Sequence, residues 1–207
     1  MTTDGIRIGV LGSGTGTNCE AIITACSRGE IHGSVVIVVS DVADAPILDR
    51  ARQHDIQTTY IGPSGLKTAL EPELEEQLVQ AFEQAGVHLV ALAGYMRVIK
   101  EPLLKAFAGR ILNVHPSLLP AFPGLRAWEQ AVTYGAKITG CTVHFVDEHV
   151  DGGPIVMQHP VPIFAEDTPD VLQRRIQAME HKVFPEAIKL YAENKLRIIG
   201  RRVKILE

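Results

Sequence analysis

Short apolar runs alternate with segments of helical periodicity through the first part of the chain. The runs are rich in Val, Ile and Leu, which is typical of strands buried on both faces of a parallel sheet. The predicted strands are Ile6–Leu11, Val35–Val39, Gln57–Ile61, Val87–Ala91 and Arg110–Val114. The predicted crossover helices are 18–28, 46–54, 72–85 and 101–107. The pattern therefore predicts an α/β fold, an open, mostly parallel twisted sheet with helices on both faces.

The pattern changes after residue 115. Prolines at 116, 120 and 123 restrict the backbone, which predicts a rigid loop and then a short helix around Arg126–Tyr134. Thr139–Asp147 and Pro154–Ile163 are predicted to pair as an antiparallel hairpin, because the Asp-Gly-Gly between them is a turn signal. The tail Leu196–Leu206 alternates basic and apolar residues around a glycine, as a small edge hairpin does.

The longest predicted helix begins after Thr168, an N-cap residue, with Pro169 at the first helical position. Apolar residues at helical spacing predict a stripe that lies on the sheet. The stripe comprises Val171, Leu172, Ile176, Met179, Val183 and Ile188.

Composition limits the classes of function. The 207 residues favour a single domain spanning 1–207, and 46% hydrophobic with 21% charged residues is ordinary for a globular protein. A net charge of −4 offers no overall positive field for a nucleic acid. The polar start Met1–Gly5 and the short run Ile8–Leu11 predict no signal or membrane span, so a cytoplasmic protein is expected, as a monomer or homodimer.

Cysteine and histidine spacing does not suggest a metal site. Cys19, Cys26 and Cys141 form no C-x-x-C pair and are expected to be buried free thiols. The eight histidines show no H-x-x-x-H spacing. We therefore expect chemistry without a metal.

A glycine-rich loop, Gly12–Asn18, joins the first strand to the first helix. Backbone N–H groups and the helix dipole converge there, which predicts a phosphate site. One alternative is that the glycines only form a tight turn. Another is a dinucleotide site in which Asp41 binds a ribose, although Thr17 stands where that fingerprint needs its third glycine.

The strongest candidate chemistry lies in Asn-Val-His-Pro at the carboxyl end of a predicted parallel strand, where open α/β sheets bind ligands. Asn113 and His115 are two residues apart and therefore project to the same side of a strand. Asp151 lies in the Asp-Gly-Gly loop, with His144 on the preceding strand. Alone, His115 could be structural and Asp151 an ordinary turn residue. Together they predict a catalytic centre.

Five segments form a family pattern: G-S-G-T-G-T-N at 12–18, L-A-G-Y-M-R at 92–97, N-V-H-P-S-L-L-P-A-F-P-G at 113–124, H-F-V-D-E-H-V-D-G-G-P at 144–154 and Q-A-M-E-H at 177–181. With this pattern the chain resembles the phosphoribosylglycinamide formyltransferases over nearly its whole length. The resemblance implies transfer of a formyl group from 10-formyltetrahydrofolate, a reduced folate, to the amine of glycinamide ribonucleotide in purine biosynthesis.

The resemblance also implies roles for individual residues. The catalytic trio would be Asn113, His115 and Asp151. The ribonucleotide-binding residues would be Thr15, Gly16, Thr17 and Asn18 for the phosphate and Gln177 and Glu180 for the ribose. The folate-binding residues would be Met96, Arg97, Val98, Ile99, Asn113, Val146, Asp147, Glu148, His149 and Val150. By spacing alone, Gln177 and Glu180 would read as a solvated helix face.

The chain departs from the family pattern at a few positions. Segment Gly65–Glu73 carries Lys67 but no arginine, where the family often has an arginine for the folate glutamate tail. Ala121 and Trp128 stand where basic or histidine residues are common. The catalytic trio is unaffected by these changes.

Related formyl-folate enzymes are the nearest alternatives. The methionyl-tRNA formyltransferase has an added C-terminal domain and lacks the A-F-P-G continuation found at 121–124, and the formyltetrahydrofolate hydrolase has an added N-terminal domain. Chain length therefore favours the ribonucleotide enzyme. A nucleotide-binding regulatory module, with a structural His115, is the alternative from another class.

Overall fold

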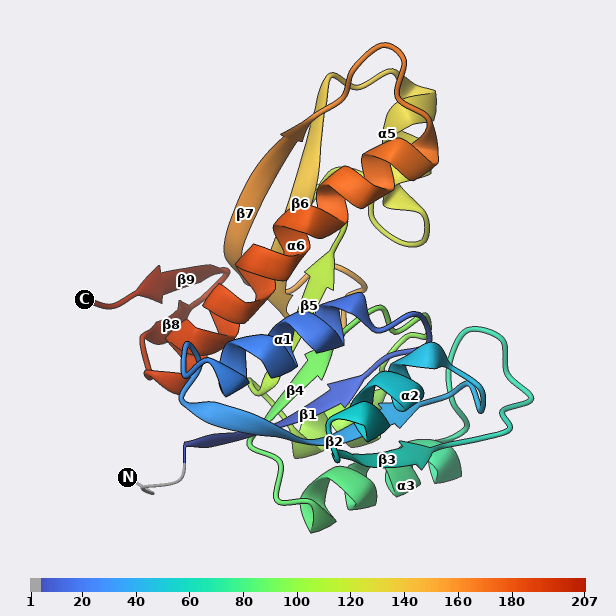
Figure 1. Cartoon of the computed structure of the whole chain (residues 1–207), viewed down its shortest axis with the longest axis vertical. Helices are drawn as coiled ribbons and strands as arrows, with labels where there is room; N and C mark the ends of the chain where they lie inside the picture. The colour runs from blue at the N-terminus through green and yellow to red at the C-terminus, as the bar shows by residue number, and fades with distance from the viewer. Residues whose placement is uncertain (1–4) are drawn as a thin grey trace. The chain divides into compact units, whose positions relative to one another are not determined.

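A computed structural model describes residues 5–207 (Figure 1), and residues 1–4 of the predicted polar start lie outside this part of the chain. The described chain forms two compact units, the first ending at Leu112 and the second beginning at Asn113. The division falls inside strand β5 (Ile111–His115). A single domain spanning 1–207 stays a prediction, because compact units can still unfold cooperatively.

The first unit contains a parallel sheet in the order β3-β2-β1-β4, followed by β5. Its strands are β1 (Ile6–Leu11), β2 (Gly33–Ser40), β3 (Gln57–Tyr60) and β4 (Leu89–Leu92). Ile8, Val10 and Ile37 are fully buried, as expected for strands covered on both faces. The predicted parallel α/β architecture is therefore confirmed.

Helices follow each strand of this unit. They are α1 (Thr17–Ser27), α2 (Pro46–Gln53), α3 (Pro72–Gln84) and α4 (Glu101–Ala106). Helix α1 packs beside α2, and α3 packs beside α4. Because parallel crossovers are right-handed and the strand order reverses at β1, these two pairs cover opposite faces of the sheet. The predicted boundaries differ from the observed ones by one or two residues at most element ends.

The second unit is built around an antiparallel pair, β6 (Ile138–Phe145) and β7 (Ile155–Pro162). The tail forms β8 (Leu196–Ile199) and β9 (Arg202–Ile205), and β9 pairs with β7. Both predicted hairpins are present. The short helix α5 covers Ala127–Tyr134.

Helix α6 (Pro169–Ala192) packs against β6 and β7 (Figure 1). The Thr168 hydroxyl accepts from the Val171 amide, so the predicted N-cap is confirmed. Leu172, Ile176 and Ile188 are fully buried, as the stripe predicts. Val171 is 36% exposed, so its predicted place in the buried stripe is wrong. It lies in the first turn of α6.

The structure also bears on what composition predicted for the cysteines and for membrane spans. Cys19 and Cys141 are buried, but Cys26 is only half-buried, so the expectation of three buried thiols is wrong for Cys26. Burial raises the pKa of the Cys19 thiol to about 12. Within residues 5–207, no helix has both the length and the apolar character needed to cross a membrane.

Candidate active site

The glycine-rich loop uses its glycines in two ways. Gly16 caps α1 with a left-handed φ of 76°, and a Cβ there would lie 2.7 Å from Ile47 Cγ1. A Cβ on Gly12 would lie 2.6 Å from the Ala93 carbonyl. A Cβ on Gly14 would meet no atom within 4 Å. The tight-turn explanation therefore accounts for Gly12 and Gly16, while Gly14 leaves open space beside the backbone.

Hydrogen bonds fix this loop to its own unit. The Ser13 amide donates to the Gly94 carbonyl at 3.1 Å, and the Gly14 carbonyl accepts from the Ile47 amide at 3.1 Å. Arg50 Nε donates to the Thr15 carbonyl at 2.7 Å. Thr15 is exposed, Thr17 is half-buried and Asn18 is buried at the start of α1. A loop held in this way is preorganised for an anion at the helix N-terminus.

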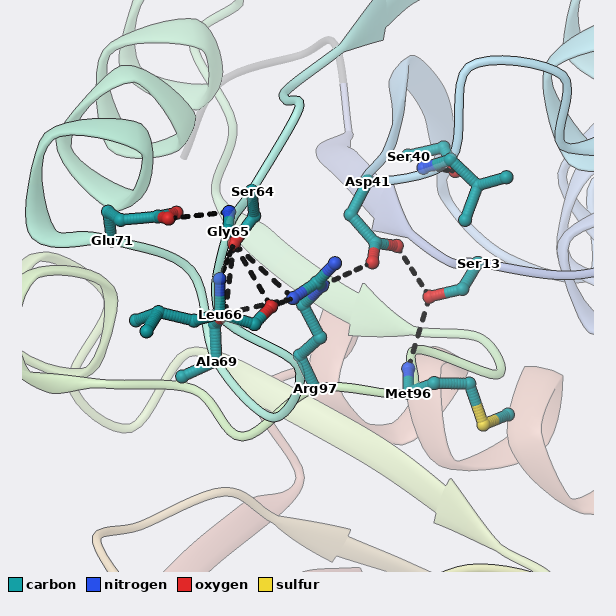
Figure 2. Close-up of polar contacts among 11 residues, drawn as sticks. Ser13, Ser40, Asp41, Ser64, Gly65, Leu66, Ala69, Glu71, Met96 and Arg97 are labelled. Atoms are coloured by element: carbon teal, nitrogen blue, oxygen red, sulfur yellow. Dashed lines mark hydrogen bonds and ion pairs between the residues drawn. The ribbon is translucent and has the colours of Figure 1, made fainter.

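Asp41 does not present a free carboxylate to a ribose. Its Oδ2 accepts from Arg97 Nε at 2.6 Å, and its Oδ1 accepts from the Ser13 hydroxyl at 2.6 Å (Figure 2). The Asp41 side chain is only 5% exposed. Both carboxylate oxygens are used inside the unit, which disfavours the dinucleotide alternative.

The segment Met96–Ile99 is fixed through alternate backbone amides. The Met96 amide donates to Ser13 Oγ at 3.1 Å and the Val98 amide to the Thr68 carbonyl at 2.8 Å. Just beyond the segment, the Lys100 amide donates to Glu75 Oε1 at 2.6 Å. Burial raises the pKa of Glu75. Met96 is 54% exposed, so an apolar side chain faces solvent from a rigid segment.

In the second unit, His115 and Asp151 lie side by side. His115 Nδ1 is 3.4 Å from Asp151 Oδ2, and His115 Nε2 is 2.9 Å from the Phe122 carbonyl. His115 is 4% exposed. Both contacts of the ring are to oxygen atoms, one of a carboxyl group and one of a backbone carbonyl. To donate to a substrate, Nε2 must exchange its bond to Phe122.

Asp151 occupies an unusual backbone position. Its φ is 53°, a left-handed conformation that aspartate tolerates better than most residues. The Gly124 amide donates to its Oδ2 at 2.7 Å, and the side chain is 10% exposed. The turn is therefore more than an ordinary solvent loop, because it delivers a nearly buried carboxylate to a histidine.

His144 connects the trio. Its Nδ1 donates to the Phe145 carbonyl at 2.8 Å, so its Nε2 is free to accept from Asn113 Nδ2 at 3.1 Å. Burial lowers the pKa of His144, which favours this neutral form. His144 Nε2 is also 3.8 Å from Asp151 Oδ1. Asn113, His115 and Asp151 thus share one cluster, with His144 orienting the amide.

The side chains of Thr142 and Gln158 hold the loop after β5. Thr142 Oγ1 donates to the Ser117 carbonyl at 2.6 Å and accepts from the Leu119 amide at 3.0 Å. Gln158 Nε2 donates to the same oxygen at 3.0 Å and to the Leu119 carbonyl at 2.9 Å. Since this loop carries the Phe122 carbonyl and the Gly124 amide, Thr142 and Gln158 fix the surroundings of His115.

The remaining predicted residues of this unit differ in exposure. On α6, Glu180 is 5% exposed and Gln177 is half-buried, so the solvated-face alternative is wrong for Glu180. Glu180 helps to raise the pKa of Cys141, after burial of that thiol, to about 12, which places its carboxylate near β6. In the loop Val146–Val150, Glu148, His149 and Val150 are exposed, and Asp147 Oδ1 accepts from the His149 amide at 2.9 Å.

Sequence reasoning missed several groups of the site. The Phe122 carbonyl and the Gly124 amide are backbone atoms and leave no signal in side-chain chemistry. Arg97 is predicted to bind folate, and the structure shows that its side chain bonds to Asp41. The sequence signal for such an ion pair was a basic residue within an otherwise apolar segment. Among residues 5–207, no three His, Cys, Asp or Glu side chains gather to hold a metal ion, and the metal-free reaction stays a prediction.

Comparison with known proteins bears on this cluster. The formyl transferase family matches residues 6–188, which include the Asn113, His115 and Asp151 cluster. The chain belongs to the formyl transferase family. This family member is 39% identical over 193 residues to the phosphoribosylglycinamide formyltransferase of Escherichia coli K12, covering 93% of the chain and 90% of that relative.

Solved structures agree with this membership. The glycinamide ribonucleotide transformylase 1 of Symbiobacterium toebii is 50% identical to this formyl transferase, with a TM-score of 0.95 and coverage of 100% and 96% of the two chains. A formyltetrahydrofolate deformylase of Pseudomonas syringae has a TM-score of 0.91, covering 99% of the chain and 67% of that protein. It is only 20% identical, so that likeness supports the fold alone.

Proposed function

We propose that this chain is a phosphoribosylglycinamide formyltransferase. It transfers the formyl group of 10-formyltetrahydrofolate to the amine of glycinamide ribonucleotide, giving formylglycinamide ribonucleotide and tetrahydrofolate. The observation that carries the proposal is the partly buried cluster of Asn113, His115 and Asp151, because formyl transfer needs both an oxyanion donor and a proton relay. The relatives described above, similar over nearly their whole length, support the choice of substrate.

The reaction needs the protein to stabilise an oxyanion and to move a proton. The substrate amine attacks the formyl carbon, a tetrahedral intermediate forms, and the bond from that carbon to the folate nitrogen breaks. The proton lost by the amine ends on the leaving nitrogen. We assign the Asn113 amide and protonated His115 to the oxyanion, and Asp151 to holding His115 charged and passing the proton through water.

The Asn113 amide is suited to its task by its partner. One Nδ2 hydrogen is held by His144 Nε2, which fixes the orientation of the amide. The second Nδ2 hydrogen can then point at the developing oxyanion. A donor oriented before the reaction stabilises charge without reorganisation.

The binding residues complete the proposal. Thr15, Gly16, Thr17 and Asn18 bind the phosphate, supported by the open space at Gly14 and the α1 N-terminus. Gln177 and Glu180 bind the ribose. On the resemblance, folate contacts are assigned to Met96–Ile99 in the first unit and, separately, to Val146–Val150 in the second unit. The protein acts on small molecules, without a nucleic acid or metal, in the cytoplasm, as a monomer or homodimer.

The reaction products distinguish this formyltransferase function from that of a formyltetrahydrofolate hydrolase. The purified chain, given 10-formyltetrahydrofolate and glycinamide ribonucleotide, should form formylglycinamide ribonucleotide in step with tetrahydrofolate. A hydrolase would instead release formate at the same rate whether or not the ribonucleotide is present. Formate release without formylated ribonucleotide would therefore overturn the proposal, and so would binding of NAD with no binding of the ribonucleotide.

A further inference from the structure

The Arg97 guanidinium is committed to the protein scaffold. Besides its bond to Asp41, its Nη1 donates to the carbonyls of Leu66 and Ala69, the latter at 2.9 Å, and lies 3.4 Å from Ser64 Oγ (Figure 2). The Arg97 side chain is only 15% exposed. The guanidinium therefore bonds to a carboxylate through Nε and to loop carbonyls through Nη1.

These bonds join four separate loops. Ser13 follows β1, Asp41 follows β2, segment Ser64–Ala69 follows β3 and Arg97 follows β4. All four strands are parallel, so the loops emerge at the same edge of the sheet. Segment Ser64–Ala69 is itself braced, since the Ser64 hydroxyl lies 3.2 Å from the Leu66 carbonyl and 3.3 Å from the Ala69 carbonyl, and Glu71 accepts from the Gly65 amide at 2.7 Å.

A chain of short bonds runs from one proposed substrate segment to the other. Ser13, in the glycine-rich loop, donates to Asp41 at 2.6 Å, and Asp41 accepts from Arg97 at 2.6 Å. Ser13 Oγ also accepts from the Met96 amide, which closes a ring. Charge-assisted bonds of this length are strong and directional, so a shift at Ser13 is felt at residues 96–97.

We propose that Ser13, Asp41 and Arg97 form a positioning relay that couples binding of the ribonucleotide phosphate to binding of the folate. Arg97 is in this inference a positioning residue, and its side chain is not a substrate contact. The inference rests on the proposed function, because that function places the phosphate on Thr15–Asn18 and the pterin on Met96–Ile99. Phosphate binding shifts the backbone at Ser13 toward the anion, and the relay passes this displacement to residues 96–97 of the folate segment.

The geometry requires arginine. A guanidinium reaches Asp41 with Nε and the Ser64–Ala69 carbonyls with Nη1 at once, whereas a lysine ammonium is one point charge on a flexible stem. Arg97→Lys therefore keeps the charge next to Asp41 and breaks the two-sided connection. Ser13→Ala breaks the relay at its other end by removing a single hydroxyl.

The test measures coupling, using calorimetry on the full chain. The dissociation constant of tetrahydrofolate is determined without and with saturating glycinamide ribonucleotide, a pair that cannot react. We expect the ribonucleotide to tighten folate binding by about fivefold or more in the parent chain. In Ser13→Ala and in Arg97→Lys this ratio should fall below about twofold, and the double variant should lose no more than either single variant, because the two act in one relay.

Matched controls separate coupling from stability. Ser27→Ala and Arg28→Lys make the same chemical changes at exposed positions near the end of α1 and should keep the parent ratio. A purely structural role for Arg97 would lower the melting temperature and the active fraction without changing the ratio. An unchanged ratio in Ser13→Ala or in Arg97→Lys overturns the relay, as does a parent ratio near one. If the parent chain forms no formylated ribonucleotide, the proposed function itself fails, which the product assay reveals separately.

Discussion

The polar clusters around Arg97 and around Asp151 are held together very differently. Around Arg97, the bonds to Asp41 and from Ser13 to Asp41 are both 2.6 Å, and each carboxylate oxygen has its donor. Around Asp151, the histidine contacts are 3.4 and 3.8 Å, longer than well-formed hydrogen bonds. One cluster is saturated by the protein, and the other leaves bonding capacity unused.

This difference separates scaffold from chemistry. A saturated network stabilises one arrangement and has nothing left to offer a ligand. Catalytic hydrogen bonds are often long before substrate arrives and shorten in the transition state. Substitutions in the Asp151 cluster should therefore act on kcat, and those in the first unit should act on binding.

The largest effects are expected at Asn113 and Asp151. Asn113→Ala removes the proposed oxyanion donor, and loss of one such donor costs about 10²–10³ in rate. Single-turnover kinetics should show this loss in kcat while the variant stays folded. Gln84→Ala, which removes an exposed amide at the end of α3, should behave as the parent. A loss confined to KM would contradict the assignment.

Asp151→Asn should reduce kcat by about 10²-fold or more, since acid–base groups contribute about 10²–10⁴. The change keeps the shape and the tolerance for a left-handed φ while removing the charge beside His115. Both substrates' dissociation constants, measured by calorimetry, should move less than about tenfold. Glu186→Gln, an exposed carboxylate on α6, is the matched control. A near-normal kcat in Asp151→Asn would leave solvent as the proton carrier.

A smaller effect is expected in the glycine-rich loop. Asn18→Ala should raise the KM for glycinamide ribonucleotide by about tenfold, equivalent to about 1–2 kcal/mol for one lost bond. Folate binding measured alone should change little. Ser27→Ala, on the same helix, controls for altered helix stability. Lost folate affinity with an unchanged ribonucleotide KM would mean that the two binding segments are assigned the wrong way round.

The smallest effect is a pH dependence of stability. Burial lowers the pKa of His144 below its ordinary 6.5, so the unfolded chain binds the proton first as the pH falls. The free energy of unfolding should be highest above pH 6.5 and decline below it, by at most about 1.4 kcal/mol per pH unit for one group.

Urea unfolding between pH 8 and pH 5.5 measures this slope. His144→Gln should flatten it. Burial also lowers the pKa of His181, so His181→Gln removes that separate contribution and leaves the His144 part in place. An unchanged slope in His144→Gln would show that the neutral form of His144 does not contribute to stability.

Much of the fold could be predicted because its signals are local. Apolar runs of Val and Ile identified β1, β2 and β4, and proline at the start of α2 and α3 identified their first turns. The ends were missed by a residue or two because fraying and capping depend on neighbouring elements. Val171 was placed in the buried stripe because periodicity does not say where a helix leaves the sheet.

The candidate site was predictable where side chains carry the signal. The spacing of Asn113 and His115 placed them on one strand end, and the structure brings both into the cluster with Asp151. Their roles stay predictions. The partnership of Arg97 with Asp41 was not predictable, because it joins loops that are far apart in the sequence. Backbone partners such as the Phe122 carbonyl depend on tertiary structure alone.

The hydroxyl of Thr142 has a consequence for the temperature range of activity. It is the shared partner of three groups that hold the loop after β5. Loops can open locally at free energies well below that of global unfolding. Warming should therefore release this loop, and with it the surroundings of His115, before the sheets melt. The upper temperature limit of activity is then set by the bonds of this loop, those of Thr142 among them, more than by the hydrophobic core.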